Sequence, residues 1–562
     1  MLSKDSLVKG TFILTVAALI ARLLGVVQRI PLIVLLGDLG MAAYGVAFNL
    51  YAMLLVIATA GIPSALSKMI SERTALGQHA EANRIYRAAL LFAAAAGVVM
   101  TLLLYVFAPY YADGTANPQA VLPIQALAPA LLLFPLIAIM RGYFQGRRMM
   151  MPNGLSQIIE QIFRVGASVG LAYVLLDYSL DWAVAGASFG GVVGSVAAAA
   201  VMVYYSLKLR RTDRAEGLLA GAADTWVSPS TARSNPLTYK SIYAQLFKIS
   251  IPIVIFSLTV TLIYTIDSSI VTLLLMGQLG QAQAQEILGI LLGRAQSLAG
   301  IPIILAVALS QSVVPIISAA YSRGDMSQVS QHTSKVLQLS LLTGIPMALI
   351  ICVAAGPIDA LVFGNDRGSV IVDQFAAPII IVLTISSIFQ IVMQTSGAVL
   401  MGMGKMKPLM LHVAVGIAVK LIGSYLLAPV LGIYGIIAAT GLCFIVMTVL
   451  NLRVLRQVVS FRVLGRRRWT GLIVVTSVIT AIGAVLNWVT GTYIQPFGHP
   501  RADAFVQTVI LCLTAGGLYP LLLFITRTVS VADIQHMPGP VQRLIGRVAP
   551  RLLRARQEST NT

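Results

Sequence analysis

Two arginines, Arg22 and Arg29, stand inside the first long apolar stretch of the chain. They are seven residues apart and therefore share one face of a helix, with Gly25 between them. An arginine in the hydrocarbon core of a bilayer costs about 2.5 to 3.5 kcal/mol even on lenient insertion scales. A helix that keeps two of them is expected to turn that face toward water or an anion. We therefore expect this helix to form one wall of a cavity.

Other ionisable residues also fall within apolar stretches, and the basic ones outnumber the acidic ones. The cations are Arg22, Arg29, Arg164, Arg294 and Lys420, and the carboxylates are Glu160 and Asp267. Glu160 and Arg164 are four residues apart and can neutralise each other, while Asp267 can neutralise one further cation. Three cations then lack a protein counter-charge, so either water fills the space or a ligand supplies negative charge.

The chemistry of these groups predicts an anionic ligand. Guanidinium groups bind phosphate oxygens in a bidentate way, and a pyrophosphate offers oxygens to several of them. Neutral amides in the same spans can bond sugar hydroxyls, although polar residues also hold transmembrane helices together. The expected substrate-binding residues are Arg22, Arg29, Arg294, Gln28, Asn49 and Asp267, with Glu160, Arg164 and Lys420 as further candidates and Gln157, Gln161, Gln311, Gln390 and Gln394 as possible amide donors.

Motifs of catalysis are missing from the sequence. It holds no G-x-x-x-x-G-K-[ST] phosphate loop and no H-E-x-x-H pair, so we expect neither nucleotide hydrolysis nor a metal site. The three cysteines, Cys352, Cys443 and Cys512, lie in or beside apolar stretches and predict no disulfide framework. We therefore expect a protein that is not an enzyme and that carries no cofactor.

The composition requires a membrane protein. Hydrophobic residues make up 58% of the 562 residues and charged residues 10%, with a mean hydropathy of +0.87. A soluble domain has about 25% charged residues. Because each span needs roughly 20 apolar residues, we predict an all-α polytopic protein with about fourteen transmembrane helices. They fall near residues 10–35, 42–70, 87–109, 122–145, 153–176, 181–207, 245–276, 284–320, 335–357, 373–402, 407–428, 432–455, 469–490 and 503–526.

The positions of the basic residues predict the orientation. With the N-terminus inside, almost every basic loop cluster faces the cytoplasm, and the outward loops hold only Arg367 and Arg501. Both termini are then cytoplasmic. This rule and contact with anionic lipids explain the net charge of +19, so we expect no nucleic-acid partner. The basic segment 528–562 has amphipathic spacing and is expected to lie flat on the inner leaflet.

An internal repeat divides the spans into halves. Gly146, Pro152 and Arg164 recur as Gly402, Pro408 and Lys420, each displaced by 256 positions and in the same membrane orientation. Parallel halves are a transporter architecture with the substrate site between them. We predict two six-helix lobes and two appended helices, with these boundaries: N-lobe 1–207, cytoplasmic linker 208–244, C-lobe 245–456, two helices 457–527 and tail 528–562.

The sequence also resembles a known family over about residues 5–530. The segments that carry the likeness are KGTFILTVAALIARLLGVVQRIPLIVLLG, AYGVAFNLYAMLLVIATAGIPSALSKMISE and RGYFQGRRMMMPNGLSQIIEQIFRV. They are similar to the lipid II and polysaccharide flippase branch of the multidrug/oligosaccharidyl-lipid/polysaccharide superfamily, with its MurJ-type, SpoVB-like and YtgP-like members. The resemblance implies a MATE-like, two-lobe flippase of the bacterial plasma membrane, with a central cationic cavity for an undecaprenyl-pyrophosphate sugar.

The resemblance also implies positions for the cavity arginines, on spans one, two and eight of MurJ-type proteins. Arg22 matches the first arginine of span one, and Arg294 matches the arginine of span eight. Gln28 stands where the family has a second arginine in span one, and Arg29 lies one residue away from that position. The sequence departs from the family in span two, because Ala42–Gly61 holds no charged residue.

Three functions stay open on the sequence alone. The first is a flippase that moves lipid II or another undecaprenyl-pyrophosphate-linked sugar from the inner to the outer leaflet, driven by the membrane potential or an ion gradient and working beside cell-wall synthesis proteins. The second is a cation-coupled multidrug exporter, which would need a cavity dominated by carboxylates. The third is a membrane enzyme acting on prenyl-linked sugars, which would need an outward carboxylate cluster.

Overall fold

The structure is a computed structural model. It describes residues 7–215, 238–364, 369–493, 498–526 and 528, with the side chains of 7–12, 15, 214–215 and 305–312 excepted. Helices make up nearly all of this part of the chain, and it contains no strand. The predicted all-α fold is confirmed.

Seven helices and a short 3-10 turn form the N-lobe. They are α1 (Leu7–Thr59), α2 (Ile62–Ala75), α3 (His79–Gly114), the turn Pro118–Ala120, α4 (Val121–Leu127), α5 (Ala130–Gly146), α6 (Met151–Leu176) and α7 (Leu180–Ala215). α6 packs along both α7 and α1, and α5 packs on α2 and α3. Small residues allow the closest of these contacts, because a side chain at Gly190 would meet the backbone of Ser168.

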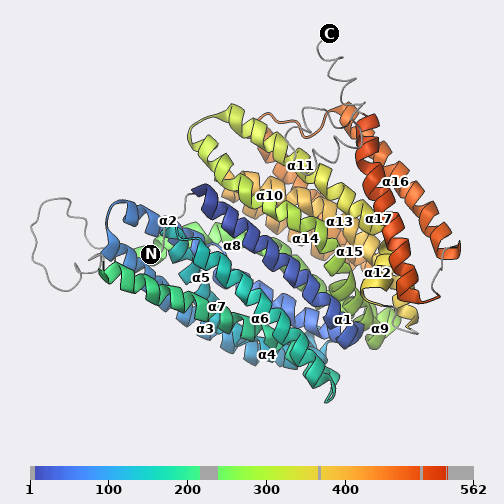
Figure 1. Ribbon diagram of the computed structural model, residues 1–562, viewed down its shortest axis with the longest axis horizontal. Helices are drawn as coiled ribbons and strands as arrows, with labels where there is room; N and C mark the ends of the chain where they lie inside the picture. The colour runs from blue at the N-terminus through green and yellow to red at the C-terminus, as the bar shows by residue number, and fades with distance from the viewer. Residues whose placement is uncertain (1–6, 216–237, 365–368, 494–497, 527, 529–562) are drawn as a thin grey trace, which may run out of the picture.

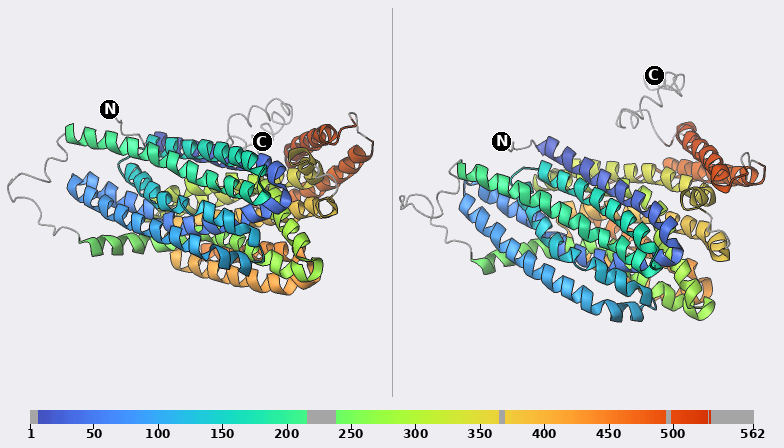
Figure 2. Two further views of the ribbon diagram at one scale, coloured as in Figure 1. Left: turned by 90° about the horizontal axis from the view of Figure 1, so that it is seen from below. Right: turned by 60° about the horizontal axis from the view of Figure 1, so that its bottom comes forward.

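The C-lobe follows with the same kind of packing. It consists of α8 (Tyr239–Leu279), α9 (Gln281–Gly289), a π-helical turn (Ile290–Ala295), α10 (Gln296–Ser322), α11 (Met326–Val353), α12 (Ala355–Val362), α13 (Val370–Gly402), α14 (Met406–Leu431) and α15 (Ile433–Val458). The last two helices, α16 (Arg466–Tyr493) and α17 (Pro500–Ile525), pack on α11 and α12 and stand at one side of the molecule (Figure 1, Figure 2).

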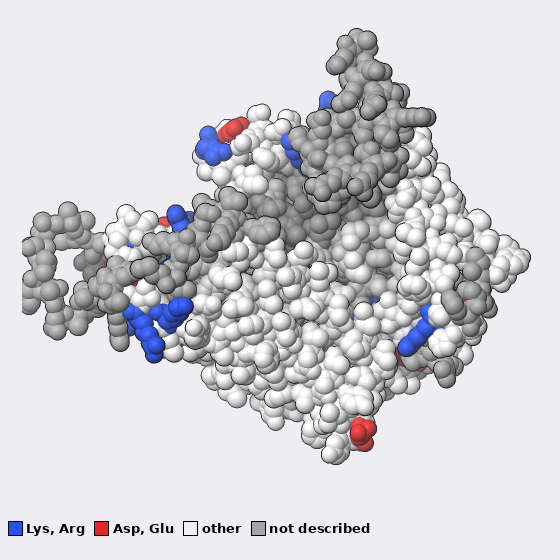
Figure 3. Space-filling view, in the orientation of Figure 1, with Lys and Arg blue, Asp and Glu red and all other residues white. Residues whose placement is uncertain are grey.

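The surface agrees with a multi-pass membrane protein. Across the face drawn in Figure 3 the broad centre carries almost no charge, and the Lys, Arg, Asp and Glu side chains lie toward its edges. By length and composition, twelve helices in the described part of the chain can cross a membrane, or up to thirteen if the bent pair α4 and α5 is one span. The count of fourteen therefore stays a prediction. One of the twelve candidates, Val16–Ala75, covers 60 residues, and Gly37 interrupts it with a φ of 62° between the two stretches predicted as separate spans.

The turns within the two copies of the repeated motif have the same geometry. Between α5 and α6 three backbone N–H groups, of Arg147, Arg148 and Met149, bond the carbonyls of Tyr143, Gln145 and Phe144. The turn between α13 and α14 repeats this pattern 256 positions later, at residues 403, 404 and 405. Both turns also pass through the left-handed region at equivalent residues, Arg148 with φ 60° and Gly404 with φ 70°.

The predicted linker begins and ends differently in the structure. α7 continues to Ala215 and α8 begins at Tyr239, where Thr238 caps it by accepting from the Ser241 N–H. Long helices therefore extend into the segment predicted as a loop from 208 to 244. The predicted amphipathic tail lies outside the described residues, apart from Thr528.

α1 joins the two lobes. It contacts α8, α9, the π-helical turn and α10, all of which belong to the C-lobe. The contact is close because glycines face it: a Cβ at Gly45 would lie 2.6 Å from Leu292 Cδ1, and one at Gly289 would collide with the Asp38 carbonyl. Backbone therefore meets backbone where α1 crosses α9.

This contact predicts the effect of adding one methyl group. Gly289→Ala should destabilise the folded protein by about 1–3 kcal/mol, because the obstacle is a main-chain carbonyl that no rotamer change can move. The measurement is the melting temperature of the purified protein in detergent. The matched control is Gly277→Ala on α8, where nothing lies within 4 Å of the added Cβ. Equal melting temperatures for the two variants would contradict the packing.

Candidate functional site

A cavity of about 410 Å³ lies between the two lobes. α1 lines it from both sides of Gly37, α6 lines it from the N-lobe, and α8, α10 and α13 line it from the C-lobe. Its polar lining consists of Arg22, Gln28, Arg29, Tyr44, Asn49, Gln161, Arg164, Thr261, Tyr264, Gln296, Ser297, Gln390 and Gln394. The first long helix therefore forms one wall of a cavity, as predicted.

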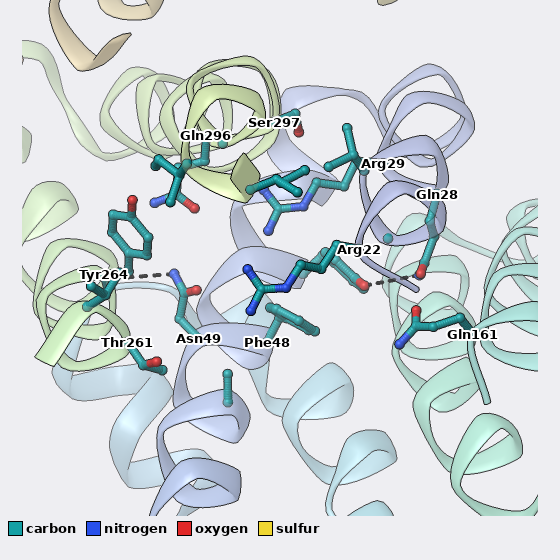
Figure 4. A pocket seen from close by; sticks show the side chains of 18 of the residues that line it. Arg22, Gln28, Arg29, Phe48, Asn49, Gln161, Thr261, Tyr264, Gln296 and Ser297 are labelled. Atoms are coloured by element: carbon teal, nitrogen blue, oxygen red, sulfur yellow. Dashed lines mark hydrogen bonds between the residues drawn. The ribbon is translucent and has the colours of Figure 1, made fainter. Parts of the chain in front are cut away.

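Arg22 and Arg29 extend into this cavity from positions about two turns apart on α1 (Figure 4). Arg22 is exposed, and no carboxylate in the described part of the chain pairs with it. Arg29 is half-buried and donates from Nη1 to the Leu292 carbonyl at 3.1 Å. A single carbonyl leaves most of the guanidinium donors of Arg29 available, since an arginine carries five N–H groups.

Arg164 is the third arginine of the lining, and it is compensated. Its Nη2 lies 3.3 Å from Glu160 Oε1, and its guanidinium stacks over the ring of Phe134. Glu160 is buried and also binds Arg141 at 2.9 Å, so one carboxylate serves two arginines. The alternative in which Glu160 and Arg164 neutralise each other is confirmed, although Arg164 still reaches the cavity wall.

The neutral polar groups are held in place by hydrogen bonds. Gln28 donates to the Tyr44 hydroxyl at 3.4 Å, and Asn49 donates to the Tyr264 carbonyl at 3.3 Å. The Tyr264 hydroxyl in turn donates to Gln390 at 2.9 Å. Gln28 and Asn49 therefore line the cavity as predicted. Gln161, Gln390 and Gln394 line it too, whereas Gln157 is not part of the lining and the Gln311 side chain lies outside the described residues.

The expected place of Arg294 in this cavity needs correction. Arg294 is 1% exposed and sits in the π-helical turn, outside the cavity lining. Its guanidinium lies 2.8 Å from Asp38 and 3.1 Å from Asp359, and it also donates to the Gly364 carbonyl. The sequence analysis counted neither Asp38 nor Asp359 among the carboxylates near these cations, so it overcounted the uncompensated cations.

Asp267 and Lys420 also lie outside the cavity. They form an ion pair with a distance of 2.5 Å between Lys420 Nζ and Asp267 Oδ1, in the interior of the C-lobe. Each therefore neutralises the other. The sequence assigned Asp267 one cation without identifying it, and the structure shows that the cation is Lys420.

Several lining residues escaped the sequence-based search. Tyr44, Phe48, Tyr264, Gln296 and Ser297 were not among the candidates, yet all of them line the cavity. Single hydroxyl and aromatic side chains in apolar helices give no signal of their own. Tyr44 and Phe48 are four residues apart, and their rings stack with centroids 6.0 Å apart. This pair of aromatic residues at helical spacing was the one feature of the sequence that could have indicated them as lining residues.

No group of three or more His, Cys, Asp or Glu side chains in the described residues is arranged to hold a metal ion. The cysteines Cys352, Cys443 and Cys512 are free thiols.

The Arg294 cluster predicts a large loss of stability when its cation is removed. Arg294→Gln should cost about 3–5 kcal/mol, because Asp38 and Asp359 would then be buried without their counter-charge. The measurement is the melting temperature in detergent, with Arg87→Gln on the exposed side of α3 as the matched control. An Arg294→Gln protein as stable as this control would contradict the role of the cluster.

Comparisons with known proteins agree with this geometry. The family model described as Polysaccharide biosynthesis protein matches residues 7–321, more than half of the chain, and the model described as MatE matches residues 252–426. A curated relative, the lipid II flippase MurJ of Bacillus subtilis (strain 168), is 28% identical over 530 residues, which cover 92% of this chain and 94% of the relative.

Two solved structures share the fold at low sequence identity. The lipid II flippase MurJ in its inward closed conformation is 14% identical with a TM-score of 0.62, over 91% of this chain and 99% of that chain. A multidrug resistance MATE family transporter in its inward-facing conformation is 13% identical with a TM-score of 0.62, over 78% and 94% of the two chains. The predicted MATE-like arrangement of two lobes is thereby confirmed.

Proposed function

This chain belongs to the polysaccharide biosynthesis protein family, and we propose that it is a flippase for an undecaprenyl-pyrophosphate-linked sugar. The observation that carries the proposal is the polarity of the cavity: Arg22 and Arg29 enter it, and no carboxylate lines it among the described residues. The relative named as a lipid II flippase supports lipid II as the substrate. No cofactor takes part in this proposal.

The chemistry of the lining matches the two parts of such a headgroup. Arg22 and Arg29 carry two positive charges without carboxylate partners in the described structure, and a diphosphate supplies a comparable negative charge. The amides of Gln28, Asn49 and Gln390 are oriented by their bonds to tyrosines and offer neutral hydrogen bonds to sugar hydroxyls. The tyrosine and phenylalanine rings supply flat apolar surfaces.

In the proposed mechanism, the ion cluster around Arg294 closes the cavity at one end. Asp38 belongs to the N-lobe, while Arg294 and Asp359 belong to the C-lobe, so the cluster ties the lobes together. Under the predicted topology these residues lie toward the outer side of the membrane. Opening the cavity outward then requires the Asp38–Arg294 pair to separate, and substrate enters from the inner leaflet.

The alternative of a multidrug exporter finds support in the MATE-like fold, but the cavity argues against it. A cavity that binds cationic drugs needs negative charge, and here the charged side chains of the lining, as far as the structure describes it, are all arginines. We likewise propose transport rather than chemical conversion, with the membrane potential or an ion gradient as the energy source. Anionic lipids and cell-wall synthesis proteins are the partners that this role implies.

Arg22 and Arg29 should each be needed for substrate binding. Arg22→Gln and Arg29→Gln should each weaken binding of an undecaprenyl-pyrophosphate sugar by roughly 10- to 100-fold, because each removes charged hydrogen bonds worth about 1.5–3 kcal/mol. The measurement is binding to the purified protein, followed by complementation of a flippase-depleted bacterial strain. Arg87→Gln should bind and complement as the unaltered protein does. Full binding by the Arg22→Gln, Arg29→Gln double variant would refute the proposal.

The proposed orientation can be tested with impermeant thiol reagents. In a variant without the three native cysteines, Asp177→Cys should react in intact cells, and Arg148→Cys should react only after the membrane is permeabilised. Both positions are exposed, and they lie at opposite ends of α6. The reverse labelling pattern would show that the N-terminus is outside.

A further inference from the structure

A fully buried ammonium group lies inside the C-lobe, away from the cavity. Lys420 on α14 is 0% exposed, and its Nζ lies 2.5 Å from Asp267 Oδ1 and donates to the Ile436 carbonyl at 2.9 Å. Asp267 comes from α8 and Ile436 from α15. The ammonium is therefore held by oxygens of two other helices, and none of these residues lines the cavity.

The surroundings of Lys420 are those of a small cation site. A carboxylate and a helix carbonyl face the charge, and the single hydroxyl proton of Thr440 can be donated either to the second oxygen of Asp267, at 3.4 Å, or to the same Ile436 carbonyl, at 3.2 Å. Ionisable residues inside transmembrane segments pair with one another or with backbone carbonyls and mark ion paths, and backbone carbonyls coordinate Na⁺ in transporters. Ser424, one turn from Lys420 on α14, is fully buried, and its hydroxyl has no partner among the described residues.

The helices around Lys420 are packed closely enough to fix these oxygens. Gly416 and Gly423 let α15 approach α14, since a Cβ at Gly416 would lie 2.5 Å from Met447 Sδ and one at Gly423 would lie 3.0 Å from Ala439 Cβ. A buried ion pair contributes little net stability compared with apolar residues of the same size. The pair is therefore better explained by the charge it places there than by the stability it adds.

The site is connected to the cavity through α8. Tyr264, which lines the cavity and binds Asn49 and Gln390, lies one turn before Asp267 on this helix. A change in the charge bound at Asp267 therefore acts on the helix that carries part of the cavity wall.

We propose that the Lys420 ammonium is a built-in cation that occupies a monovalent-cation site formed by Asp267, Ile436 and Thr440. The unaltered chain then binds no inorganic cation at this place. Removal of the lysine side chain leaves the same oxygens free to take Na⁺. The inference concerns the C-lobe alone and does not depend on the substrate of the cavity.

The test compares the unaltered protein with Lys420→Ala in detergent. Melting temperatures are measured in NaCl and in N-methyl-D-glucamine chloride at equal concentration, over a titration of Na⁺, together with binding of radioactive Na⁺. Lys420→Ala should gain roughly 2–4 °C in melting temperature from Na⁺, in a saturable way, as a ligand that binds only the folded state does. The unaltered protein should show no such gain.

Two controls assign the effect to this site. Lys407→Ala removes an exposed lysine from the same helix and should not respond to Na⁺. The double variant Lys420→Ala, Asp267→Asn lacks the carboxylate and should lose the response. Two results with Lys420→Ala would overturn the inference: a protein that folds in neither salt, or one that folds but does not respond to Na⁺. Saturable Na⁺ binding by the unaltered protein would also overturn it, if Asp267→Asn abolishes that binding. Substrate binding by the unaltered protein is measured separately, so a failure here is distinguishable from a failure of the proposed function.

Discussion

The cost of placing a charge in hydrocarbon organises this molecule. Every cation in its apolar helices must meet oxygen, because an uncompensated charge away from water costs several kcal/mol. Arg294 meets two carboxylates, Arg164 shares one with Arg141, and Lys420 meets Asp267. The side chains of Arg22 and Arg29 instead extend into the cavity. The cavity is therefore the place where the structure leaves positive charge for something else to satisfy.

The other main constraint is the joining of the lobes. α1 packs on α6 in the N-lobe, breaks at Gly37 and contacts the C-lobe on both sides of this break, at Arg29 and at Gly45. The break places Asp38 where the Arg294 guanidinium can bind it, and Gly289 gives room for the Asp38 carbonyl. The same helix thus supplies the two cavity arginines that lack a carboxylate partner in the described structure and also the carboxylate that links the lobes. Motion of α1 at Gly37 would change the cavity and this link together.

The sequence predicts features that follow from local patterns. Apolar runs predicted the helices, and the spacing of Gly146 and Gly402 predicted turns that match bond for bond. The cost of buried charge predicted that Arg22 and Arg29 face a cavity. The place of Arg294 could not be predicted in this way, because its partner Asp38 lies 256 positions earlier and reaches it only through the tertiary fold. Pairing between distant helices has no local signature, so counting charges along the chain overestimated the free cations.

The repeat explains why the positive charge of the cavity lies on one side. Arg164 and Lys420 occupy equivalent positions in the two lobes, yet only Arg164 reaches the cavity. Its carboxylate, Glu160, stands one turn earlier on the same helix, so the guanidinium stays at the surface of the lobe. The carboxylate for Lys420 comes from α8, a different helix, and it holds the ammonium in the lobe interior. The position of one acid in each half thus decides whether the equivalent base faces the cavity or is buried in the lobe.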